Sequence, residues 1–275
     1  KVLTEDIIEK ACIERLTSEK HYNHINAFVS KDLVDSKENI LETIKDGTGR
    51  RNVKEIILPE ILFDSLKAIN PQIPDHILQN IVEDLRLYST NKDIKDINYE
   101  NYKMIKDGIR VEYEKDGKKK QDIVRLIAFN NAYRNDFTVV SQMWIRGELY
   151  FRRPDLILFV NGLPMVFIEL KNSDVKLKTA YDKNLKDYIR DIPQLFFFNQ
   201  FCVLSNAKET RIGSFTAGYE HFFEWLRLKE EDKVNRKEIR KDGTSLEYLI
   251  DGLFSHDELL DYIENFILYE NKREK

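Results

Sequence analysis

Two apolar stretches joined by a short turn constrain the fold of this chain more than any other feature. Leu156–Val160 contains no polar residue, as expected of a strand that is buried on both faces. Asn161 and Gly162 follow, and this dipeptide is a strong signal for a hairpin turn. Residues 165–170 return as a second apolar strand. The sequence therefore predicts a buried antiparallel hairpin that other elements cover on both sides.

Three charged residues stand at the end of this hairpin opposite to the turn. Asp155 begins the first strand, whereas Glu169 and Lys171 lie two positions apart in the second and so point the same way. Two carboxylates can bind Mg²⁺ together with water and phosphate oxygens, and the carbonyl of Leu170 could add a ligand. Such an ion lowers the pKa of a bound water, which an ammonium group can orient. The pattern predicts a magnesium-dependent site for phosphodiester hydrolysis.

These residues also have a purely structural interpretation. Asp155 could cap the start of a strand, and Lys171 could be a solvated strand end. A Pro-Asp pair followed at some distance by Glu-x-Lys is a loose pattern by itself. The apolar residues between the charges favour a site, because a surface hairpin rarely has so apolar an interior and then ends in three charges.

The whole chain predicts an α/β protein with a mixed central sheet of about four to five strands, flanked by helices. A helical insertion is expected over residues 30–105, and a helical extension at the C-terminal end. The other predicted helices span residues 4–17 (capped by Thr4), 75–85, 178–192, 217–228 and the segment after a capping box of Ser255 and Glu258. The other predicted strands span residues 109–113, 123–129, 137–145 and 201–204.

Composition excludes several classes of protein. The net charge of −4 argues against a dedicated DNA-binding module, which would be strongly basic, but not against a site rich in carboxylates. The two distant cysteines, Cys12 and Cys202, form neither a disulfide framework nor a zinc site, and they fit a reducing compartment. No apolar run reaches membrane-spanning length, so no membrane partner is expected. The chain also lacks the Gly-x-x-x-x-Gly-Lys-Ser/Thr loop that binds ATP.

The segment RRPDLILFVNGLPMVFIELKNS resembles the nuclease segment of the restriction (R, motor) subunit of type I restriction–modification enzymes. The resemblance extends through FTVVSQMW upstream, and through IPQLFFFNQFCVLSNA and RIGSFTAGYEHFFEWLR downstream, covering residues 130–230 well. It implies a PD-(D/E)xK, restriction-endonuclease-like core that cleaves double-stranded DNA with Mg²⁺, or with Mn²⁺ in its place.

The resemblance also implies roles for individual residues. Asp155 and Glu169 become metal ligands, and Lys171 becomes the catalytic lysine. An acidic residue on the first helix completes the site in this family, for which Glu9 is the first choice and Glu5 the second. An ordinary solvated helix glutamate is the alternative for Glu9.

Related nucleases carry a Gln-x-x-x-Tyr motif on the helix after the Glu-x-Lys strand. Asn184 and Tyr188 occupy these positions here, and the shorter asparagine is a departure from the motif. With Lys186 and Arg190 they are the DNA-binding candidates, in a segment (171–190) with six basic and three acidic residues. A half-buried tyrosine and a merely solvated helix face are the alternatives. Residues 118–120 form a second predicted basic loop, with the same ambiguity.

Full R subunits of this family continue into an ATP-driven DNA translocase, and they act with methylase (M) and specificity (S) subunits. We therefore expect residues 1–230 to form the endonuclease domain and residues 231–275 to form a linker and a helix leading towards the motor domains, which alone would use ATP. The expected location is the cytoplasm of a prokaryotic cell. Two other functions stay open: a non-catalytic module that docks the motor onto the M and S subunits, and a free-standing nuclease.

Overall fold

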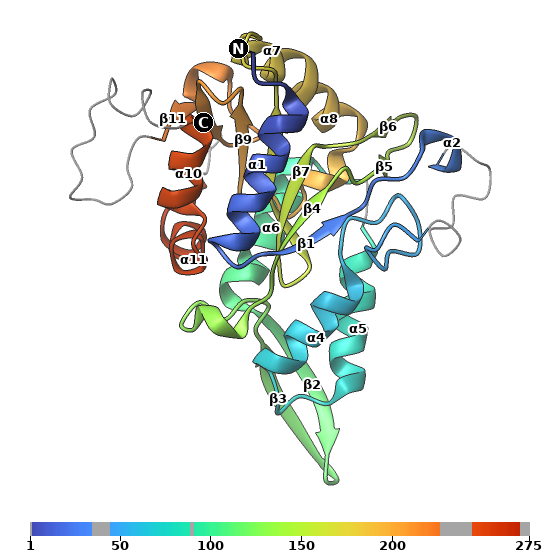
Figure 1. Cartoon of the computed structure of the whole chain (residues 1–275). Helices are drawn as coiled ribbons and strands as arrows, with labels where there is room; N and C mark the ends of the chain where they lie inside the picture. The colour runs from blue at the N-terminus through green and yellow to red at the C-terminus, as the bar shows by residue number, and fades with distance from the viewer. Residues whose placement is uncertain (1, 35–44, 89–90, 226–243, 270–275) are drawn as a thin grey trace, which may run out of the picture.

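The predicted hairpin lies in the middle of a seven-stranded sheet (Figure 1). The computed structural model describes residues 2–34, 45–88, 91–225 and 244–269. β7 (Leu156–Val160) pairs antiparallel with β8 (Leu163–Leu170), and every residue of both strands is buried. The strand order is β1-β4-β7-β8-β9-β10-β11. The other strands are β1 (Asn23–Asn26), β4 (Phe137–Ser141), β9 (Phe201–Ser205), β10 (Thr210–Gly213) and β11 (Phe223–Glu224).

The sheet is mixed, because β1 runs parallel to β4, and β8 runs parallel to β9, while the other neighbours are antiparallel. This architecture confirms the predicted α/β class with a mixed central sheet flanked by helices. The prediction of four to five strands was too low. β1, β10 and β11 are short and partly polar, so their sequences carry little alternation, and their pairing with neighbours defines them.

The turn between β7 and β8 shows why its two residues suit it. Asn161 and Gly162 have φ angles of 53° and 77°, the left-handed conformation that a tight hairpin requires. The buried Asn161 amide donates to the carbonyl of Leu126 over 2.9 Å. A Cβ atom on Gly162 would lie 2.5 Å from the carbonyl oxygen of Leu58, so only glycine fits there.

Helices from the N-terminal and C-terminal parts of the chain pack against the sheet. α1 (Glu5–Ser18) buries Ile8, Cys12 and Leu16 and contacts β8 and β1. Thr4 precedes it as predicted, but its side chain makes no capping hydrogen bond. α10 (Ser245–Leu253) packs beside α1 (Figure 1), and α11 (His256–Asn265) follows it in the same hydrophobic core.

The predicted capping box at Ser255 and Glu258 is wrong. Ser255 precedes α11 but accepts no capping hydrogen bond. Thr244 and Glu247 form a complete capping box at the start of α10 instead. Residues 231–243 of the predicted linker lie outside the described residues.

The insertion contains α2 (Lys31–Val34), α4 (Pro59–Ile69), α5 (Asp75–Arg86) and α6 (Ile94–Asp107). α5 matches its prediction. A hairpin of β2 (Ile109–Lys115) and β3 (Lys118–Val124) projects beyond it, away from the main sheet (Figure 1). Asp116 and Gly117 form its turn, with φ angles of 55° and 70°. Residues 118–120 therefore belong to a strand and not to a loop, and the strand predicted over 123–129 ends at Val124.

Three other predicted elements differ from the structure. The strand predicted over 137–145 ends at Ser141. Residues 178–192 are helical, but α7 (Leu177–Thr179) and α8 (Lys186–Asp191) flank a π-helical segment, Ala180–Leu185. The helix predicted over 217–228 is wrong in its described part, which forms one 3₁₀ turn (Tyr219–His221) and β11. Pairing of β11 with β10 and the complete burial of Phe222 override the helical pattern there.

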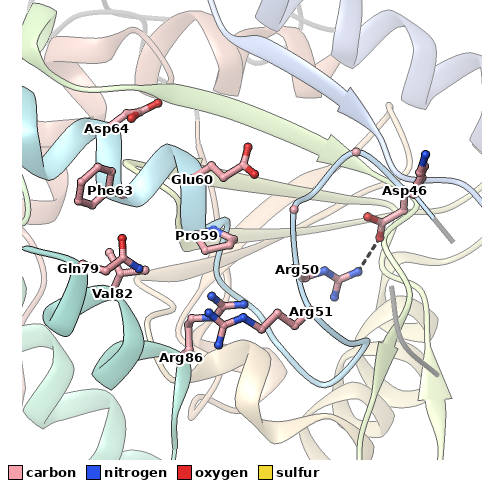
Figure 2. A pocket seen from close by; sticks show the side chains of 13 residues that line it. Asp46, Arg50, Arg51, Pro59, Glu60, Phe63, Asp64, Gln79, Val82 and Arg86 are labelled. Atoms are coloured by element: carbon pink, nitrogen blue, oxygen red, sulfur yellow. Dashed lines mark hydrogen bonds and ion pairs between the residues drawn. The ribbon is translucent and has the colours of Figure 1, made fainter. Parts of the chain in front are cut away.

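Ion pairs within the insertion, and a hydrogen bond from it to the connection after β4, hold the insertion beside the sheet. A cavity of about 780 Å³ at these residues is lined by α4, α5 and residues 45–51 (Figure 2). The buried Arg50 side chain pairs with Asp46 at 2.9 Å and donates to the carbonyl of Trp144, in the connection after β4. Arg86 pairs with Glu55 at 3.0 Å. These contacts hold residues 45–55 in place beside β4.

None of the helices in the described parts of the chain is both long and apolar enough to cross a membrane.

Candidate active site

The structure brings Asp155, Glu169 and Lys171 together at one edge of the sheet. Asp155 directly precedes β7, and Glu169 lies near the end of the antiparallel β8. One Asp155 carboxylate oxygen accepts a hydrogen bond from the Leu170 N–H over 2.8 Å. The Lys171 Nζ atom lies 3.1 Å from Glu169 Oε1. The hairpin therefore produces the convergence that the sequence predicted, with two acids and one amine in a single site.

Glu169 carries the clearest sign of a ligand site. Its side chain is 3% exposed, and its Oε2 atom has no hydrogen-bond partner among the described residues. Burial raises the pKa of this carboxyl well above its ordinary value, and the negative charge of Asp155 raises it further. A buried carboxylate oxygen without a partner costs free energy, which a bound cation would offset.

The pKa values of Asp155 and Lys171 are shifted by burial and by the neighbouring charges. Burial raises the pKa of Asp155, although the Leu170 N–H and the Lys171 charge oppose this shift. Burial would lower the pKa of Lys171, but Glu169 and Glu5 outweigh it and raise that pKa. Lys171 thus stays protonated, and the acids beside it compensate its charge.

The N-terminal end of α1 is fixed to the loop that follows β8. The backbone N–H of Leu3 donates to Ser173 Oγ, and the Glu5 N–H donates to Asn172 Oδ1, both over 2.8 Å. The Ser173 N–H returns a bond to the Leu3 carbonyl over 2.9 Å. These contacts position the acidic face of α1 over the end of the sheet.

Both glutamates predicted on α1 reach the site, from different sides. Glu5 lies 3.6 Å from Lys171. Glu9 accepts a hydrogen bond from the Gln142 amide over 2.6 Å, and it lies near enough to Asp155 for their charges to interact. Burial is the largest cause, and the Asp155 charge the second, of a Glu9 pKa raised to about 7. Glu9 is therefore the acid that joins the Asp155 side of the site.

Gln142 is a site residue that the sequence prediction missed. It follows β4 directly, and its backbone N–H donates to the Asp155 carbonyl over 3.0 Å. Its φ angle of 58° is uncommon for a residue other than glycine. This conformation turns the chain at the end of β4, so that the amide can contact both Glu9 and Asp155. The only available signal was a polar residue immediately after a buried strand.

The four DNA-binding candidates do not form one exposed basic face. Tyr188 is 7% exposed, packs edge to face on Phe167, and donates from its hydroxyl to the Arg153 carbonyl over 3.4 Å. Asn184 hydrogen-bonds to the Tyr188 hydroxyl. Tyr188 thus supports the segment before Asp155, and a contact of either residue with DNA stays a prediction.

The two cations on this helix already have acidic neighbours. Lys186 lies 3.6 Å from Asp182. Arg190 pairs with Asp187 at 3.0 Å and with Asp191 at 2.7 Å. Acidic neighbours therefore compensate the positive charge of Lys186 and Arg190, although residues 171–190 contain more basic than acidic residues.

The donor set fits Mg²⁺ better than a metal that requires a cage of protein ligands. In the described ranges, no group of three or more histidine, cysteine, aspartate or glutamate side chains is arranged to hold a metal by itself. Mg²⁺ is usually bound by one or two carboxylates and keeps several waters or phosphate oxygens. Asp155 and Glu169 would supply the carboxylates, with Glu9 beside them.

Glu9 should make metal binding dependent on pH. With a pKa of about 7, Glu9 holds a proton at lower pH in the metal-free protein, and a metal must displace protons from its ligands. We expect the affinity for Mn²⁺ or Mg²⁺ to rise with pH, because the metal must displace the Glu9 proton. This proton should contribute up to about a tenfold rise in affinity per pH unit below pH 7, and no further rise well above pH 7. Calorimetric titration from pH 5.5 to 8.5 measures this dependence.

Glu9→Gln should reduce the slope of log affinity against pH by up to about 1, because one proton fewer is displaced when the metal binds. Glu14→Gln, on an exposed part of α1, is the matched control and should leave the slope unchanged. An identical slope in wild type and Glu9→Gln would exclude Glu9 from the metal site.

The family model "Type I restriction enzyme R protein N terminus" matches residues 2–221. The chain is 31% identical over 293 residues to the putative type I restriction enzyme MjaIXP endonuclease subunit of Methanocaldococcus jannaschii, covering 98% of this chain and 26% of the relative. It is 34% identical over 229 residues to the type I restriction enzyme HindI endonuclease subunit of Haemophilus influenzae, covering 81% of this chain and 21% of the relative. The chain thus spans about a quarter of the length of these curated relatives.

Proposed function

Since this chain belongs to the family of type I restriction enzyme R protein N termini, we propose that it is the magnesium-dependent endonuclease domain of such an R subunit. Its substrate is double-stranded DNA, which the ATP-driven motor domains of the full subunit translocate before cleavage. Methylase and specificity subunits are its protein partners. The observation that supports this most is the buried Glu169, whose unpartnered Oε2 atom lies in one site with Asp155 and Lys171.

Each residue has a distinct task in this proposal. Asp155 and Glu169 would hold the ion, with Glu9 on the Asp155 side. Bound there, Mg²⁺ would supply Lewis-acid activation of a water molecule and of the phosphate. Lys171 orients the attacking water and offsets the negative charge that develops on the phosphate oxygens in the transition state. Gln142 positions the Glu9 and Asp155 carboxylates by hydrogen bonds.

Reconstitution tests the proposal as a whole. The full-length R subunit that carries this chain would be assembled with its M and S subunits, and supplied with an unmethylated plasmid, ATP and Mg²⁺. We expect double-strand cleavage that stops when Mg²⁺ or ATP is withheld, and a fully methylated plasmid should stay intact. Translocation without cleavage would contradict the nuclease and favour a docking module. Cleavage by this chain alone, without ATP or partners, would favour a free-standing nuclease.

A further inference from the structure

One cation beside the candidate active site has no acidic partner among the residues that the structure describes. Arg153 lies two residues before Asp155, in the connection between β6 (Phe151–Arg152) and β7. Among the residues that the structure describes, its guanidinium forms no ion pair and no hydrogen bond with a side chain or carbonyl. The adjacent Arg152, in contrast, donates to the Asp191 carboxylate over 2.7 Å. Arg153 therefore keeps its five N–H donors for another acceptor.

Two aromatic rings hold this guanidinium in place. Its carbon atom lies 5.2 Å from the centre of the Phe28 ring and 5.0 Å from that of the Trp144 ring. Trp144 is fixed in turn, because its indole N–H donates to the Val29 carbonyl over 3.0 Å. Cation–π contacts of this kind restrain an arginine without using its N–H donors. We call Phe28, Trp144 and Arg153 the arginine clamp.

The clamp stands at the same edge of the sheet as the acids. Phe28 follows the end of β1, Trp144 follows the end of β4, and Arg153 precedes β7. β1 and β4 are parallel, and β7 is antiparallel to β4, so these three points adjoin one another. Burial raises the pKa of Glu9, and the Arg153 charge is among the influences that oppose this rise, so the guanidinium lies within electrostatic reach of the site. Phe28 is 57% exposed, so the clamp borders solvent.

We infer that the arginine clamp is a binding site for a DNA backbone phosphate next to the one that is cleaved. This inference rests on the proposed function. A planar guanidinium pairs with two oxygens of a phosphate at once, and an exposed aromatic ring can lie against a sugar or a base. The clamp would position the strand over Asp155 and Glu169 and carry no sequence specificity, as expected of a backbone contact.

DNA binding without cleavage tests the clamp. The 275-residue chain would be titrated with a fluorescent 30-base-pair duplex in Ca²⁺ buffer at several salt concentrations. We expect Arg153→Ala to weaken binding about tenfold at low salt, and to reduce the slope of log affinity against log salt by about 1. Arg110→Ala, at an exposed position in β2, is the matched control and should change neither quantity.

A second pair of variants separates a phosphate contact from a structural role. Phe28→Ala removes one ring of the clamp and should weaken binding about threefold, whereas Phe28→Tyr keeps the ring and should bind as wild type does. If Arg153→Ala does not fold, this pair decides the question. Equal affinities of the two Phe28 variants, or an Arg153→Ala slope equal to that of Arg110→Ala, would overturn the inference, as would absence of DNA binding by the wild-type chain at low salt.

Cleavage assays on the assembled enzyme show whether the arginine clamp or the proposed nuclease function is at fault when a result is negative. Arg153→Ala should raise the DNA concentration needed for half-maximal cleavage about tenfold. If the wild-type enzyme cuts DNA but the variant is indistinguishable from it, only the clamp is refuted. If the wild-type enzyme does not cut, while the salt slope still falls in Arg153→Ala, the clamp stands and the nuclease assignment fails.

Discussion

Replacement of Asp155 by alanine is expected to abolish DNA cleavage by the assembled enzyme while its ATPase activity persists. Asp155 is the acid that the hairpin holds against the Leu170 N–H, beside Glu169. Loss of a metal ligand removes stabilisation worth several kcal/mol, and about 1.4 kcal/mol corresponds to a factor of ten in rate. We expect a decrease on the order of 10³-fold or more in the rate of plasmid linearisation.

The control for this variant is Asp174→Ala. Asp174 is exposed in the loop after β8, and its replacement should leave cleavage within a factor of two of wild type, on the order expected for a surface change. ATP hydrolysis measured on the same samples shows whether the motor is intact. Cleavage by Asp155→Ala at the wild-type rate would contradict the assignment of Asp155 as a metal ligand.

Lys171→Ala should also stop cleavage, but for another reason. The lysine binds no metal, so the variant should keep its affinity for Mn²⁺ while the catalytic rate falls. Lys176→Ala, an exposed lysine in the same loop, is the matched control. Loss of metal binding in Lys171→Ala would show that the lysine acts by holding Glu169 and Glu5 in place.

Replacement of Glu169 by glutamine is expected to remove metal binding and, at the same time, to stabilise the metal-free protein. Folding raises the pKa of Glu169 well above its ordinary value of 4.5, mainly through burial. The native state therefore binds this proton more tightly than the unfolded state, so the contribution of this group to stability is fully present at low pH and is lost as pH rises towards the folded pKa. Glutamine keeps the shape of the protonated acid and has no such loss.

Thermal unfolding in EDTA and in Mn²⁺ measures both effects. At pH 8 without metal, Glu169→Gln should unfold a few degrees above wild type, since about 1 kcal/mol corresponds to roughly 2–4 °C in a domain of this size. Near pH 4, where the carboxyl is protonated in both states, the difference should vanish. Mn²⁺ should raise the unfolding temperature of wild type and leave that of the variant unchanged. A variant that is less stable than wild type at pH 8 would contradict the cost assigned to the buried carboxylate.

The sequence by itself determined the central hairpin and the charges at its open end. Leu156–Val160 is apolar throughout, and Asn161 and Gly162 accept the left-handed turn, so local chemistry and chain geometry define this unit. Alternation along β8 places Glu169 and Lys171 on one side, and the tight turn brings Asp155 back to them. The α/β class followed for the same reason, because a hairpin buried on both faces needs layers above and below it.

Only the tertiary structure decided how the rest of the chain joins that unit. The contacts of the start of α1 with Asn172 and Ser173 span 167 and 170 positions, and no local pattern encodes which of its acids faces Asp155. The hydrogen bond from Gln142 to Glu9 and the packing of Phe28 on Arg153 likewise join residues distant in sequence. Propensity and periodicity describe neighbours along the chain, whereas these contacts form because packing of the whole core brings separate segments to one edge of the sheet.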